Sequence, residues 1–133
     1  MVMPPDMNEI ERFAGEALQV IPDGLRQHLD GVVIMVEEFP SKEVMQDLGL
    51  ESPFDLLGLY SGIALGDKSV GMTPQDVDRI FLYRRPILDY WCETGEALDR
   101  IVRHVLIHEV GHHFGLSDAD MERIEQQADE ASG

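Results

Sequence analysis

The chain has 133 residues, enough for one hydrophobic core and too few for two domains of typical size, so we expect residues 1–133 to form a single domain. Hydrophobic residues make up 44% of the chain and charged residues 27%, the balance of an ordinary globular protein. With 26 acidic against 10 basic residues, the formal net charge of −16 would repel phosphates and anionic lipid headgroups, so neither a nucleic acid nor a membrane is an expected partner.

Hydrophobic periodicity, β-branched runs and turn residues divide the chain into helices and strands. In chain order, the expected elements are a helix over 7–20, a further turn over 25–29, a strand over 32–39, a short helix over 41–48, a strand over 56–63, a loop over 66–75, a strand over 80–85, a long helix over 94–113 and a last helix over roughly 119–130. Pro22, Pro40 and Pro86 stand where three of these elements should end. The pattern predicts an α+β domain with a small sheet of three to four strands packed against helices.

Residues that favour helix ends support these boundaries. Candidate N-caps are Asp6 or Asn8, Ser41, Thr94, and Ser117 or Asp118. Gly49 and Gly115 stand just past two of the predicted helices, where glycine commonly ends a helix. Within the second strand, Gly58 and Gly62 suggest a bulge or a close approach of another backbone.

The end of the long helix carries a pattern suited to a divalent metal. His108 and His112 are four residues apart and therefore stand one turn apart on the same side, where both imidazoles can reach one tetrahedral zinc ion. With Ile101 and Val105 they form the stripe expected to pack against the sheet, where two imidazoles without partners would be costly. Glu109 is displaced around the helix axis from both histidines, so it can serve as the general base that takes a proton from water.

The pattern continues beyond the second histidine. Gly115 should end the helix and let the chain turn back, so that Asp118 can offer a carboxylate as the third ligand. Three protein ligands with one open position are typical of a catalytic zinc site. Asp120, Glu122 and Glu125 on the last helix remain alternatives for the third ligand, and Asp118 has the alternative role of a helix cap.

The segment 108–118, HEVGHHFGLSD, resembles the zincins, and more narrowly a family of small bacterial "minimal" zincin-like metallopeptidases. The resemblance extends over about residues 30 to 125 and includes the strands at 57–60 and 81–86. It implies a reduced zincin fold with helices at both ends, one zinc ion held by His108 and His112, and Glu109 as the base. True metzincins carry a methionine turn well downstream of the third ligand, and Met121 comes too soon to be that turn.

Other polar residues near the motif have both a functional and a structural interpretation. His104, one turn before His108, either hydrogen-bonds a carboxylate behind the metal or is an ordinary histidine at the edge of the core. His113 points away from the metal and is a candidate substrate contact. Tyr60 or Tyr83 could polarise a scissile carbonyl, but both also fit sheet packing.

Three further features bear on compartment and surface. Cys92 is the only cysteine, which excludes an intramolecular disulfide and a thiolate zinc cluster, and we expect it to be a buried or half-buried thiol. Arg84 and Arg85 alternate across the third strand and favour surface ion pairs. The first residues lack a basic segment followed by an apolar run, and no window approaches roughly eighteen apolar residues, so a cytoplasmic protein is expected.

These features predict a zinc metallopeptidase that hydrolyses peptide bonds through a water activated by the metal. Its partner would be a peptide or protein substrate added to the edge of the strand at 32–38 or at 56–63. One alternative is a zinc-binding or peptide-binding protein of zincin fold without turnover, which a fourth protein ligand would favour. Another is a metal-free core that contains both histidines. The sequence specifies neither the cleavage preference nor the oligomeric state.

Overall fold

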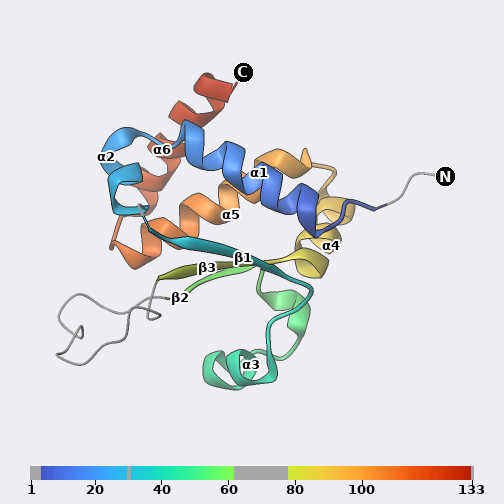
Figure 1. Ribbon diagram of the computed structural model, residues 1–133. Helices are drawn as coiled ribbons and strands as arrows, with labels where there is room; N and C mark the ends of the chain where they lie inside the picture. Colours follow the sequence, from blue (N-terminus) through green and yellow to red (C-terminus); the bar gives the residue numbers. More distant parts are fainter. Residues whose placement is uncertain (1–3, 30, 62–77, 133) are drawn as a thin grey trace, which may run out of the picture.

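The computed structural model describes residues 4–29, 31–61 and 78–132 (Figure 1). In chain order the elements are α1 (Met7–Val20), α2 (Asp23–Arg26), the 3-10 turn η1 (Gln27–Leu29), β1 (Val33–Glu37), α3 (Lys42–Leu48), the 3-10 turn η2 (Pro53–Asp55), β2 (Gly58–Ser61), β3 (Arg79–Tyr83), α4 (Arg84–Thr94), α5 (Leu98–His113) and α6 (Asp118–Ser132). The loop predicted over 66–75 lies outside the described residues. Within the described part of the chain, no helix is long and apolar enough to cross a membrane.

The three strands form one mixed sheet in the order β1-β3-β2. β1 runs parallel to β3, with Ile34 opposite Ile80, and β2 runs antiparallel to β3, with Tyr60 opposite the same residue. The central strand β3 is therefore the most buried, and its Ile80 and Leu82 are inaccessible to solvent. α1, α5 and α6 lie on one side of the sheet and α3 on the other (Figure 1). The predicted α+β fold, with a small sheet packed on the motif helix and the terminal helices, is confirmed.

The core is built around α5, which contacts α1, α4, α6 and the strands β2 and β3, while α1 lies beside it on β1. Its buried residues are Leu98, Ile101, Val102, Arg103, Val105, Leu106, Ile107, Val110 and Gly111. From α1, Ile10, Ala14 and Ala17 recur at helical spacing and are buried in the same cluster. Each large aliphatic side chain buried in this way contributes roughly 1.5–3 kcal/mol. The hydrophobic effect therefore fixes α5 more firmly than the shorter helices.

Most of the predicted helix ends are confirmed. The side chains of Asp6, Ser41 and Ser117 accept hydrogen bonds from backbone N–H groups in the first turns of α1, α3 and α6, at 2.9, 3.2 and 3.1 Å. Gly49 and Gly115 take the left-handed conformation, with φ of 65° and 72°. Because that conformation is costly for residues with a Cβ, both glycines end their helices as predicted.

A helix stands where the sequence predicted the end of a strand. β3 ends at Tyr83 and α4 follows at once, so the strand predicted over 80–85 is two residues too long. Pro86 was interpreted as a strand terminator but is the third residue of α4. There the backbone N–H that proline lacks would have no partner within the helix, so proline is tolerated.

The two arginines expected to alternate across that strand instead begin α4. The Arg84 Nη1 atom lies 3.1 Å from Glu38 Oε1, and its Nε donates a hydrogen bond of 2.7 Å to the carbonyl of Pro5. Arg85 stands over the ring of Phe39, 5.9 Å from its centroid. The expectation of an ion pair is confirmed for Arg84, while the expected strand geometry is wrong.

The long helix predicted over 94–113 is α5, which begins four residues later than predicted, at Leu98. Gly95, with φ of 73°, ends α4, and α5 begins three residues later. Thr94 is therefore not the cap of α5, because its hydroxyl donates a hydrogen bond of 2.9 Å to the Tyr90 carbonyl at the end of α4. The start was placed too early because Thr94 closes the preceding helix α4, which the sequence did not predict.

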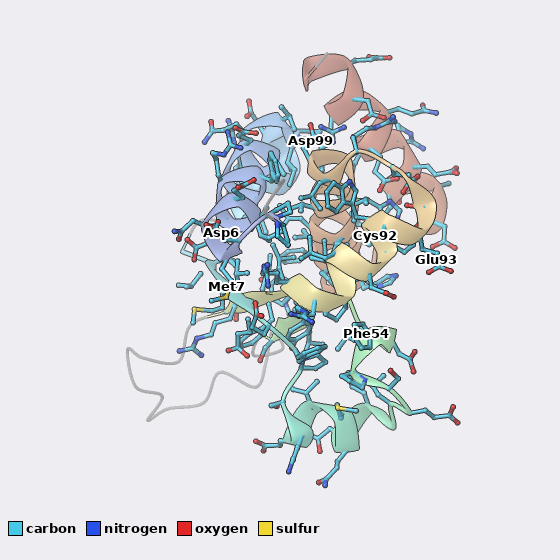
Figure 2. All side chains as sticks on the ribbon, turned by 90° about the vertical axis from the view of Figure 1, so that its right-hand side faces the viewer. Asp6, Met7, Phe54, Cys92, Glu93 and Asp99 are labelled. Atoms are coloured by element: carbon cyan, nitrogen blue, oxygen red, sulfur yellow. The ribbon has the colours of Figure 1, made fainter. Side chains whose placement is uncertain are left out.

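Cys92 lies on the exposed side of α4, next to Glu93 (Figure 2). The expectation of a buried or half-buried thiol is wrong. The buried side of α4 is formed by Pro86 and Ile87, one to two turns earlier. Cys92 points away from these two residues and is therefore not part of the core.

The glycine predicted to allow a close backbone approach is Gly58 at the start of β2. A Cβ atom built there would lie 2.6 Å from Val105 Cγ1 and 3.0 Å from the Phe81 carbonyl oxygen. Both distances are shorter than ordinary van der Waals contacts, and neither the β-branched valine nor the backbone can easily move. Gly58 therefore sets how closely β2 approaches α5.

We predict that Gly58→Ala lowers the free energy of unfolding by about 1–3 kcal/mol, since the added methyl group overfills this contact. The matched control is Gly15→Ala in α1, where a Cβ meets nothing within 4 Å. That change should raise the free energy of unfolding by about 0.5–1 kcal/mol, because alanine favours the helix. Urea denaturation measures both, and a Gly58→Ala protein as stable as wild type would contradict the close approach.

Candidate metal centre

Three histidines follow one another at four-residue spacing on α5. The ring centroids of His104 and His108 are 4.1 Å apart, and those of His108 and His112 are 6.0 Å apart. The His104 side chain is 55% exposed and that of His108 is 30% exposed, and His112 is exposed as well. The sequence predicted that these histidines lie on the face of α5 that packs in the core. That prediction is wrong, because the core face is centred on Val102 and Leu106.

Instead, the histidines border a groove of about 250 Å³ between α5 and the chain that enters β2. Leu56, Leu57 and Gly58 form one wall of this groove. The opposite wall is α5, which contributes Ile101, His104, Val105, His108, Glu109 and His112. The predicted stripe of α5 thus exists, but it faces a solvent-accessible groove rather than a dry core.

The predicted base, Glu109, is half-buried at the edge of β2. Its Oε1 atom accepts a hydrogen bond of 3.2 Å from the backbone N–H of Tyr60. Burial raises the pKa of Glu109, while this hydrogen bond and the charge of His112 oppose the rise. A carboxylate with a raised pKa is better suited to take and return a proton near neutral pH than an exposed one.

His108 occupies the middle of the three-histidine series and faces α6. Its Nε2 atom lies 3.5 Å from Glu125 Oε1. Burial lowers the pKa of His108, and so does the charge of His104, whereas Glu125 and Asp118 act in the opposite direction. The neutral imidazole, which is the form that binds metals, is therefore favoured.

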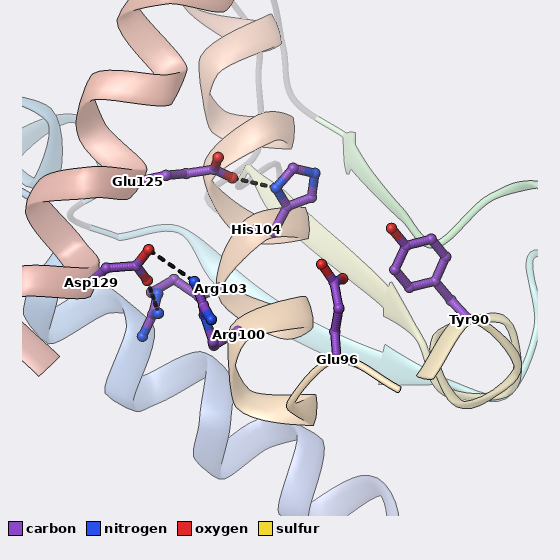
Figure 3. A pocket seen from close by; sticks show the side chains of 7 residues that line it. All are labelled: Tyr90, Glu96, Arg100, Arg103, His104, Glu125 and Asp129. Carbon is purple, nitrogen blue, oxygen red and sulfur yellow. Dashed lines mark hydrogen bonds and ion pairs between the residues drawn. The ribbon is translucent and has the colours of Figure 1, made fainter. Parts of the chain in front are cut away.

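A group of three metal-ligating side chains converges at this point. Within the described part of the chain, ligand atoms of His104, His108 and Glu125 all lie within 4.8 Å of one another. His104 Nδ1 also forms an ion pair with the same Oε1 atom of Glu125 (Figure 3). That oxygen is buried and has no hydrogen bond of ordinary geometry. A buried carboxylate oxygen facing two imidazole nitrogens is a donor arrangement that suits zinc.

Asp118, the first choice for the third ligand, is exposed at the start of α6. It is not the cap of that helix, because the Ser117 hydroxyl takes that role. Its charge acts on His108, but among the described residues the predicted set of His108, His112 and Asp118 does not bring its ligand atoms within 4.8 Å of one another. Asp118 as a zinc ligand therefore stays a prediction.

The role of His104 was left open by the sequence, and Glu125 was only an alternative ligand. Two signals pointed to them. His104 repeats the spacing of the motif one turn earlier, and Glu125 stands seven residues after Asp118, on the same side of α6. What the sequence did not contain is the register between α5 and α6, which places Glu125 opposite His104 and His108.

The aromatic side chains near the groove pack on one another. His113 stacks on Tyr60, with ring centroids 3.8 Å apart and planes 10° from parallel. The Tyr60 hydroxyl donates a hydrogen bond of 3.1 Å to Asp78, and burial and this carboxylate raise the pKa of Tyr60 to about 12. Tyr83 is 1% exposed and belongs to the core, as its sheet-packing interpretation predicted.

A second hollow of about 250 Å³ continues the groove towards α6. Figure 3 shows the side chains that line it, which are Tyr90, Glu96, Arg100, Arg103, His104, Glu125 and Asp129. Asp129 pairs with both Arg100 and Arg103, so its carboxylate is neutralised within this part of the lining. Tyr90, Glu96 and His104 belong to both hollows and connect them.

Comparison with known proteins gives one family. A family model described as "Zincin-like metallopeptidase" matches residues 29–128, which include all three strands, the three histidines, Glu109 and Glu125. No curated protein matches the chain.

Proposed function

Because the chain belongs to the zincin-like metallopeptidase family, we propose that it is a zinc-dependent peptidase. One zinc ion per chain would be held by His108 and His112, with Asp118 as the third ligand. The observation that carries the proposal is the position of Glu109, a half-buried carboxylate that lies in the same groove as both histidines and is oriented by Tyr60.

The chemistry of the donors supports this assignment. Imidazole nitrogen with carboxylate oxygen suits zinc, and three protein ligands leave the open position that a catalytic site needs. The lowered pKa of His108 favours the neutral ring that a metal requires. When bound, zinc would supply a Lewis acid that makes water more acidic and polarises the substrate carbonyl.

Glu109 would move the proton in this reaction. Its Oε1 is held by the Tyr60 N–H, so we assign Oε2 as the atom that takes the proton from the attacking water. The same carboxyl then delivers that proton to the leaving amine. Burial favours the protonated intermediate state of Glu109, because the raised pKa reduces the cost of holding the proton between the two steps.

The edge of β2 is the surface that we propose for the substrate. β1 and β2 are the outer strands of the described sheet, and α5 contacts β2. The carbonyl of Leu57 accepts a hydrogen bond from Tyr83 N at 2.9 Å, so by strand alternation Gly58 and Tyr60 direct their backbone groups outward. The Tyr60 N–H is taken by Glu109, so an extended peptide would pair with the backbone groups of Gly58 and the carbonyl of Tyr60, and would run along the groove beside His108.

We predict that Glu109→Gln lowers kcat by at least about 100-fold without loss of zinc, because the amide cannot take the proton. Activity is measured on a library of fluorogenic peptides and zinc by elemental analysis. The matched control is Glu93→Gln, which removes an exposed carboxylate at the end of α4 and should leave both unchanged. A Glu109→Gln protein that cleaves peptides at the wild-type rate would refute the assigned base.

We also predict that substrate binds at β2 and not at β1. In zinc-loaded Glu109→Gln protein, the library peptide that wild type cleaves fastest should shift the backbone amide NMR signals of Gly58 and Tyr60. The signals of Met35 and Val36 in β1 serve as the internal control and should stay in place. Shifts confined to β1 would place the substrate on the other edge of the sheet.

A further inference from the structure

The spacing of the metal motif occurs twice on α5. His104, His108 and His112 are separated by four residues each, so the helix presents two overlapping pairs of histidines with His108 in both. Side chains four residues apart lie one turn apart on the same side of a helix. Each pair can therefore direct two imidazoles at a single ion.

α6 supplies carboxylates at two levels along α5. Met121 lies against Gly111, Glu125 pairs with His104, and Asp129 pairs with Arg100, so α6 runs antiparallel to α5. Asp118 stands seven residues before Glu125, which corresponds to about 10 Å along the helix axis towards the His112 end. The pair of His104 and His108 therefore faces Glu125, while Asp118 lies towards the other pair.

Around Glu125, the side chains that could bind an ion are already close together. Glu125 Oε1 lies 3.5 Å from His108 Nε2 and is in contact with His104 Nδ1. A simple ion pair with His104 would not need this oxygen to be buried, nor to lie beside the second imidazole. Ligand atoms of His104, His108 and Glu125 lie within 4.8 Å of one another, so a single metal ion can take all three as ligands in place of the ion pair.

We propose that His104, His108 and Glu125 form a second metal position, one turn from the catalytic one, that takes a divalent transition-metal ion such as zinc. The proposal rests on the proposed function only for the identity of the catalytic position. Because both positions need His108, the chain holds an ion in one or the other and never in both.

The two positions differ at the residue that follows the first histidine. In the catalytic position His108 is followed by the base Glu109, whereas in the second position His104 is followed by Val105. Val105 is 6% exposed and packs against Gly58. An ion at the second position occupies His108, so the catalytic position stays empty and this position stores the metal in an inactive state.

The test uses Co²⁺ as the probe, because its visible absorption reports both binding and ligand geometry. Removal of His112 disables the catalytic position alone, so His112→Ala should still bind about one Co²⁺ per chain. Adding His104→Ala or Glu125→Gln to that variant should weaken Co²⁺ binding by at least about tenfold. The matched control adds His113→Ala, which removes a neighbouring histidine that stacks on Tyr60, and should leave Co²⁺ binding unchanged.

Circular dichroism and thermal unfolding of the metal-free variants separate a lost ligand from a lost fold. A folded His112→Ala protein that binds no Co²⁺ would overturn the second position, and so would a His104→Ala/His112→Ala protein that binds as tightly as His112→Ala. The test of the second metal position is independent of the test of the peptidase proposal. If wild type cleaves no peptide but His112→Ala binds Co²⁺ through His104 and Glu125, the second position stands without it.

Discussion

Every functional contact in this protein depends on how closely two neighbours approach α5. On one side, Gly58 lets β2 come so near that the Tyr60 N–H reaches Glu109. On the other side, a Cβ at Gly111 would lie 2.4 Å from Met121 Sδ, so this glycine lets α6 pack directly on the helix. Met121 is 1% exposed and is thus a packing residue beneath the metal motif, even though it stands too early in the sequence to form a methionine turn.

The second of these approaches explains why α6 takes part in the site. With Met121 fixed against α5, Glu125 faces the histidines of α5, and the ion pairs of Asp129 with two arginines hold the far end of α6. Isolated exposed ion pairs contribute little, but Arg103 is 7% exposed and its pair with Asp129 is partly shielded from solvent. The acidic character of α6, unexplained by the sequence alone, therefore serves helix packing through Asp129.

The sequence predicted what depends on local spacing. His108 and His112 were predicted to share a side of a helix because they are four residues apart, and both line the groove. The ends of α1, α3 and α6 followed from their capping residues. It did not predict α4, because Pro86 permits either a strand end or a first helical turn. Nor did it predict which carboxylate of α6 faces His108, because that depends on the tertiary register between two helices. The solvent-accessible groove was missed because it depends on how the chain that enters β2 packs beside α5.

The most direct test of the account is the zinc content of tag-free protein in wild type, His108→Ala and His113→Ala, determined by elemental analysis. His108 belongs to both metal positions, so its removal should abolish zinc binding, whereas His113 belongs to neither. The account predicts about one zinc ion per chain in wild type and His113→Ala, and none in folded His108→Ala. Zinc retained at the wild-type level by His108→Ala would contradict it.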